Sequence, residues 1–166
     1  MEWKDLLSYI FPGLLAYVVA LRTSANNRKE EIISLRKALR TELLTLQSIY
    51  YVRKIPSTPP NDGNEIKTAC IQSNYTTVYS KNADKIGLLS PDTAESVVIA
   101  YTHIATLIDT LRVYSQRWED MIRNERYGDE KWQWIFQKDV IEAHKVAYET
   151  QEITLKAVDD AIKKLS

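Results

Sequence analysis

The fold is decided near the N-terminus by an uncharged run, Leu6–Leu21, which reads LLSYIFPGLLAYVVAL. A surface helix carries a polar face, whereas only Ser8 and two tyrosines interrupt the apolar residues here. As a helix the run would be about 24 Å long, somewhat less than the roughly 30 Å hydrocarbon core of a bilayer. Trp3 lies at its outer edge, where tryptophan favours the headgroup level and lengthens a span. We therefore expect residues 1–21 to form a single transmembrane helix.

Two other structures are compatible with an apolar run of this length, a buried core helix and the apolar region of a cleaved signal peptide. A signal peptide normally begins with positive charge, whereas Glu2 and Asp5 here outnumber Lys4. A core helix would normally bring a polar face of its own. The membrane span is therefore the preferred interpretation, and the other two stay open.

The charges that flank the run predict its orientation. Lys4 alone precedes it, and the cations that follow it are Arg22, Arg28, Lys29, Arg36, Lys37 and Arg40. Because cationic residues resist translocation, the sequence predicts that the N-terminus lies outside and the body in the cytosol. Arg22, Arg28 and Lys29 would lie nearest the lipid bilayer, where anionic headgroups attract them. An ordinary positive-inside bias explains the same pattern equally well.

Small side chains recur along the run at four-residue steps. Ser8, Pro12, Ala16 and Ala20 would share one helical face, with Gly13 beside them. Faces of this kind let spans approach closely in lipid, so we expect self-association or a pore-facing role for them. The alternative is that such residues are simply common in membrane helices. Pro12–Gly13 should kink the helix, and the short span favours a homo-oligomer modestly.

The remainder of the chain, residues 22–166, is predicted to be a cytosolic four-helix bundle, which makes the fold all-α. Four glycines and five prolines are few for 166 residues, and most prolines fall in the loop 55–64. Ser90-Pro91-Asp92 combines an N-cap, a first-position proline and a first-turn acid, a strong helix start. The four helices are expected at about 22–54, 65–89, 91–127 and 130–165. The inward residues expected on the third of these are Val97, Tyr101, Ile104, Ile108, Leu111, Trp118 and Ile122.

Composition argues against several classes of function. The 22 Lys and Arg residues equal the 22 Asp and Glu residues, so no strong nucleic-acid-binding signal is present. Cys70, His103 and His144 lack the spacing of any metal motif, so neither a metal nor a cofactor is expected. The sequence also contains no glycine-rich phosphate loop and no nucleophile elbow. We therefore do not expect an enzyme of a familiar class.

His144 is the one residue with some catalytic character. It is expected to face the bundle interior, and Lys138 precedes it by six residues. A cation and an imidazole together can hold a phosphate and transfer a proton, as metal-free RNA cleavage requires. The alternative, a hydrogen-bonded core histidine near a surface lysine, is the preferred interpretation.

One stretch resembles a known family. Residues 79–92, YSKNADKIGLLSPD, followed by Val97, Val98 and Tyr101, resemble a pattern in small bacterial proteins with an N-terminal membrane helix. The whole layout is similar to the membrane accessory proteins of type VI-B CRISPR systems, which are divergent HEPN-like helical proteins. That resemblance implies a homo-oligomeric pore in antiphage defence, with a CRISPR effector or an RNA-derived trigger as partner. The HEPN signature places arginine where Lys138 stands, and lysine lacks the bidentate phosphate contact of arginine.

Three functional hypotheses follow from the sequence. The leading one is a homo-oligomeric inner-membrane protein that permeabilises or depolarises the membrane. The second is a membrane-anchored adaptor or structural module, in which the span serves only as an anchor. The third is a degenerate HEPN-like RNase that depends on Lys138 and His144.

Overall fold

The computed structural model describes residues 3–52, 54–56, 58, 76–127 and 130–166, with side chains described for 14–51, 54–56, 58, 76–123, 135 and 137–166. Its elements are helices α1 (Trp3–Val52), α2 (Thr77–Lys81), α3 (Pro91–Tyr127) and α4 (Glu130–Lys164), with a 3₁₀ helix, η2 (Ala83–Leu88). No strand occurs in these described ranges, so the fold is all-helical.

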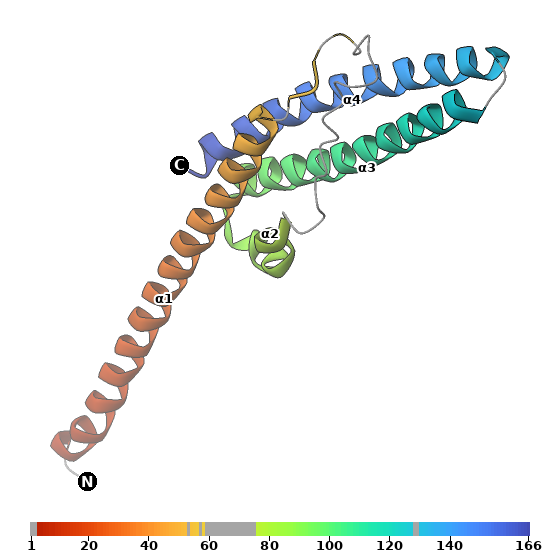
Figure 1. The fold of residues 1–166 in the computed structure, drawn as a ribbon. Coiled ribbons are helices and arrows are strands. Elements are labelled where there is room, and N and C mark those ends of the chain that lie inside the picture. The colour runs from red at the N-terminus through yellow and green to blue at the C-terminus, as the bar shows by residue number, and fades with distance from the viewer. Residues whose placement is uncertain (1–2, 53, 57, 59–75, 128–129) are drawn as a thin grey trace.

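α1 is one continuous helix of 50 residues that joins the predicted span to the predicted first body helix. The helical backbone runs through Pro12 and Gly13, and no glycine or proline follows until after Val52. In Figure 1 the C-terminal part of α1 crosses the pair α3 and α4, whereas its N-terminal part projects away from every other described element. The two halves of α1 therefore have different surroundings.

α3 and α4 form an antiparallel hairpin with a heptad seam. Buried residues recur along both helices at alternating steps of four and three, the spacing of a coiled coil. On α3 these seam residues are Thr93, Val97, Ala100, Ile104, Leu107, Leu111, Tyr114, Trp118 and Met121. On α4, and directly after its last residue, they are Val140, His144, Ala147, Gln151, Thr154, Val158, Ala161 and Leu165.

The heptad seam corrects part of the expected core. Ile108 is only half-buried and Ile122 is exposed, although both were expected to face inward. Leu107 and Met121 take the inward positions instead, because a seam of period 3.5 favours the preceding residue in each case. The start of α3 is confirmed, since the Ser90 hydroxyl accepts from the backbone N–H of Thr93 at 3.4 Å as an N-cap does.

The second half of α1 packs against the end of the hairpin where α4 finishes. Its buried residues, at three- and four-residue steps, are Leu35, Leu39, Leu43, Leu46 and Tyr50. Beside them the Arg36 guanidinium donates to the carbonyl oxygen of Lys164 at 2.8 Å, and Arg40 donates to the Ser166 hydroxyl at 3.2 Å. A cation at the last carbonyls of a helix is favourable because the C-terminal end of the helix dipole is negative.

The helix expected at 65–89 differs from the structure. Residues 65–75 lie outside the described residues, and the described remainder forms α2 and η2, separated at Asn82. The Asn82 side-chain amide donates to the carbonyl oxygen of Val78 at 2.8 Å, so the side chain occupies the acceptor that the next helical turn requires. Within the described residues, three long helices thus form the core in place of four.

Glu42 connects α1 to both α2 and α3. One carboxylate oxygen accepts from the Val78 N–H at 2.7 Å, and the other accepts from the Tyr79 N–H at 3.1 Å and from the Tyr101 hydroxyl at 2.5 Å. The Tyr79 and Tyr101 rings stack with their centroids 4.0 Å apart. Three donors on one half-buried carboxylate fix where α2 begins and hold it against the hairpin.

Glu42→Ala should lower the free energy of unfolding by about 2–3 kcal/mol, because it leaves two backbone donors and a buried hydroxyl without their acceptor. The matched control is Glu31→Ala on the same helix, which removes an exposed ion pair with Lys85 and should change stability by about 1 kcal/mol or less. Urea unfolding followed by circular dichroism would measure both changes. Equal losses for the two variants would contradict the role given to Glu42.

Tyr50 provides a test at alkaline pH. Its side chain is 2% exposed, its hydroxyl has no hydrogen-bond partner among the described residues, and burial raises its pKa to about 12. The unfolded chain ionises this phenol near its ordinary pKa of about 10, so the stability from the neutral buried form is complete below that pH and falls as pH rises towards 12.

Tyr50→Phe should therefore stabilise the protein by about 1 kcal/mol at pH 7, because it removes a buried hydroxyl without a partner. The advantage of the variant should grow by roughly 1.4 kcal/mol per pH unit between about pH 10 and 12. Denaturant unfolding at several pH values would measure the difference. A constant difference across that window would show that Tyr50 titrates normally.

Candidate functional site

The first half of α1 presents apolar side chains that nothing in the described fold covers. Leu14, Leu15, Tyr17, Val18, Val19 and Leu21 have exposed fractions between 53% and 63%. Together with the exposed Ala16 and Ala20 they surround the helix, so no single partner helix from the same chain could bury the whole segment. We call Leu14–Leu21 the exposed apolar segment; in water it would be a large unfavourable surface.

Of the small residues in the predicted span, the structure describes the side chains of two. Ala16 and Ala20 are exposed on the same face of α1, four residues apart. The side chains of Ser8, Pro12 and Gly13 lie outside the described residues, although the helical backbone passes through all three positions. Self-association through this face stays a prediction.

A polar stem separates the exposed apolar segment from the packed helices. All residues from Arg22 to Glu31 are exposed, Arg22, Arg28 and Lys29 among them. Among the described side chains of α1 the first buried one is Leu35, fourteen positions after Leu21, which corresponds to about 21 Å of helix. The three cations therefore lie next to the apolar segment and apart from the packed core, where anionic headgroups could reach them.

One helical segment in the described part of the chain, Pro91–Arg123, is long and apolar enough to cross a membrane by length and composition. Its apolar residues form one side of the heptad seam, where Val97, Ile104 and Leu107 are fully buried by other helices of the same chain. A core helix meets the same criteria of length and composition. The expected placement of the span at the N-terminus rests on the exposed apolar segment.

His144 lies inside the hairpin. It is 1% exposed, its Nδ1 is 3.2 Å from the Tyr114 hydroxyl and its Nε2 is 2.9 Å from the carbonyl oxygen of Pro56. Because a carbonyl oxygen only accepts, Nε2 is the donor to Pro56, and Nδ1 bonds to the Tyr114 hydroxyl, which can donate or accept. Both ring nitrogens are thus engaged, and the buried ring offers no surface to an RNA phosphate.

Lys138 does not share a surface with His144. Its side chain is exposed, whereas that of His144 is buried, because six residues on an α-helix correspond to about 600° of rotation and turn the two side chains to different faces. The structure therefore does not bring together the two residues that the RNase hypothesis combines.

His144→Ala should destabilise the protein by about 2–4 kcal/mol, since it opens a cavity in the seam and removes the partners of Tyr114 and Pro56. Lys138→Ala, on the exposed side of the same helix, should stay within about 0.5 kcal/mol of the parent. Thermal unfolding of the two variants would give both values. A mild effect of His144→Ala on stability would argue against the structural role of this ring.

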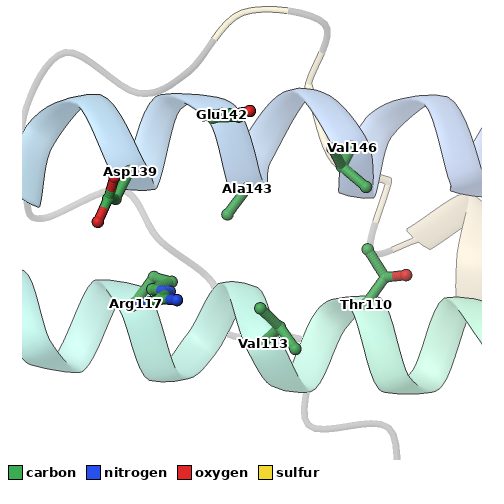
Figure 2. Close-up of a pocket in the computed structure, with 7 residues that line it drawn as sticks. All are labelled: Thr110, Val113, Arg117, Asp139, Glu142, Ala143 and Val146. Atoms are coloured by element: carbon green, nitrogen blue, oxygen red, sulfur yellow. The ribbon is translucent and has the colours of Figure 1, made fainter.

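A shallow groove runs between α3 and α4 on the side away from His144. It is lined by Thr110, Val113 and Arg117 from α3 and by Asp139, Glu142, Ala143 and Val146 from α4. Figure 2 shows Arg117 and Asp139 at one end of the groove, Val113 below Ala143 in the middle, and Thr110 below Val146 at the other end. Sequence reasoning missed this groove, although counting heptads along α3 and α4 would have placed these residues on one flank of the seam.

Neither a metal site nor a related protein assigns a function to the chain. No group of three or more potential ligands in the described part of the chain could hold a metal ion, and Cys70 lies outside that part. No protein family, curated protein or solved structure matches the chain.

Proposed function

We propose that this chain is a single-pass membrane protein that is anchored by the first half of α1 and self-associates to permeabilise or depolarise the membrane. The observation that supports the proposal most is the exposed apolar segment, which is apolar around the whole helix and has no partner in the described fold. Lipid hydrocarbon covers such a helix on all sides and needs no matching surface.

The N-terminal half of α1 is a better candidate for the span than Pro91–Arg123. Moving α3 into lipid would separate it from α4 and break the heptad seam, including Thr154, whose hydroxyl donates to the His103 carbonyl oxygen at 3.2 Å. Inserting the first half of α1 breaks no described side-chain contact with another element. The positive charges of Arg22, Arg28 and Lys29 then place the packed helices in the cytosol of a bacterial cell, with the N-terminus outside.

Permeabilisation requires more than one copy of the chain. A single helix encloses no channel, so a pore from one span per chain must be a ring of copies. Ala16 and Ala20 give one face on which neighbouring spans could approach closely, and a short apolar run favours assembly through hydrophobic mismatch.

The biological setting is carried by the resemblance alone. The resemblance to accessory proteins of type VI-B CRISPR systems implies a role in antiphage defence. It also implies a CRISPR effector or an RNA-derived trigger as the partner. No matching relative supports that setting, so it stays an expectation.

The membrane-anchored adaptor remains the second candidate, and the polar stem favours it. About 15 Å of exposed helix between Arg22 and Glu31 would hold the packed helices clear of the lipid, where a cytosolic partner could reach them. Such a module needs only an anchor, so any apolar helix of sufficient length could replace its span.

The double variant Ala16→Leu, Ala20→Leu should reduce the mass of the full-length protein in mild detergent by at least severalfold, because two larger side chains prevent close approach of neighbouring spans. Val18→Leu, on the opposite face of the same helix, is the matched control and should leave the assembly intact. Analytical ultracentrifugation with the detergent contribution subtracted would give the masses, and a voltage-sensitive dye would report depolarisation in cells that express each variant.

A monomer or dimer of the parent chain in several detergents would contradict the pore proposal. Replacement of residues 3–21 by an unrelated apolar helix separates the two candidates. Loss of depolarisation in that chimera supports the pore, whereas full function in cells supports the adaptor.

A further inference from the structure

The side of the hairpin that carries the groove is uncovered in the described structure. α1 and the segment around Ile55 pack on the other side of the seam. There the Tyr101 hydroxyl donates to Glu42 of α1, and the Ile55 N–H donates to the Gln151 side chain. We define the open face as the residues of α3 and α4 that flank the seam on the groove side. Its apolar and threonine members are Ile99, Thr106, Thr110, Val113, Ala143, Val146, Thr150 and Ile153.

The open face is suited to close packing although it contains threonines. Each of Thr106, Thr110 and Thr150 donates its hydroxyl to the carbonyl oxygen four residues earlier, at 3.0, 2.8 and 2.7 Å. These hydroxyl donors are satisfied within their own helices, so covering the threonines leaves no donor without a partner. Val113 and Val146, at 49% and 47% exposed, are the large apolar side chains at its centre.

Three charges border one end of the open face. Arg117 projects from α3 and Asp139 from α4 at this end, and Glu142 lies about one turn further along α4, level with Ala143 (Figure 2). Within the described residues none of the three makes an ion pair. The face therefore carries a cation on one helix and two acids on the other, and no described residue neutralises either charge.

This arrangement is self-complementary. A two-fold axis that runs along the groove would place α3 of one copy over α4 of the other without shifting the levels along the hairpin. Arg117 of each copy would then face Asp139 and Glu142 of the other, and Val113 of each would face Val146. The four helices would alternate in direction, as in an antiparallel four-helix bundle.

We propose that the open face is the contact between two copies of this chain, which pair through α3 and α4 in this two-fold arrangement. The occupant is a second copy because the charges match those of the same surface, and matching charges fix which partner and which register are accepted. The contact joins the packed helices and uses no residue of the span, so it goes beyond the proposed membrane function and does not require it.

The test uses two full-length charge-reversed chains, each in the Ala16→Leu, Ala20→Leu background that weakens span contacts. One carries Arg117→Glu, and the other carries Asp139→Arg with Glu142→Arg. Each chain alone would bring like charges together twice per pair, so its dissociation constant should rise about tenfold or more over that of the parent background. A mixture of the two chains restores opposite charges at both ends and should pair about as well as the parent. Arg112→Glu, an exposed arginine of α3 outside the open face that pairs with Asp109, is the matched control.

Analytical ultracentrifugation in mild detergent, over a range of protein concentrations, would measure pairing. Weak pairing of each reversed chain, with recovery in the mixture, supports the proposal and excludes misfolding as the cause. Three results would overturn it: no pairing of the parent background at any concentration, no recovery in the mixture, or an equal effect of Arg112→Glu. The same measurement on the parent chain with its native span keeps the two proposals distinct. Large assemblies that occur with the native span, and not in the Ala16→Leu, Ala20→Leu background, report contacts between spans, whereas pairing within that background reports the open face.

Discussion

The heptad seam between α3 and α4 is the constraint on which the rest of the structure depends. It aligns the two helices so that the end of α4 meets α1, where Arg36 binds the Lys164 carbonyl oxygen. Polar residues lie within it: His144 contacts Tyr114 and Pro56, and Gln151 accepts from the Ile55 N–H at 3.0 Å. His144 and Tyr114 face each other in one register of the hairpin only, so a shifted hairpin would separate them. The seam thus positions both α1 and the segment that follows it.

α1 is subject to two opposite requirements along one continuous helix. From Leu35 onward its apolar residues form a stripe that other helices bury, whereas the exposed apolar segment is apolar on every side. A protein core can cover a stripe, and lipid can cover a whole helix. Between them the polar stem has no described partner, so its helicity depends on being continuous with both ends. The packed helices and the exposed apolar segment are in this way joined through a single continuous helix.

Local signals in the sequence predicted the all-helical fold and the start of α3, because Ser90 and Pro91 act within one turn. They did not predict how the chain between 76 and 89 folds, since α2 is placed by Glu42, more than thirty residues earlier. The apolar run at the N-terminus was evident from composition, and the inward position of His144 from its spacing. The open face was not, because Arg117 and Asp139 belong to different helices and meet only when the register of the seam is known.

We expect the first half of α1, and not α3, to lie in the bilayer. A fluorophore on a single cysteine introduced at Val18, in a Cys70→Ser background of the full-length chain in vesicles, would test it directly when compared with the same label at Thr106. Brominated lipids quench only fluorophores within the hydrocarbon region. The account predicts strong quenching at position 18 and almost none at position 106. Strong quenching at position 106 with none at position 18 would contradict it and assign the span to Pro91–Arg123.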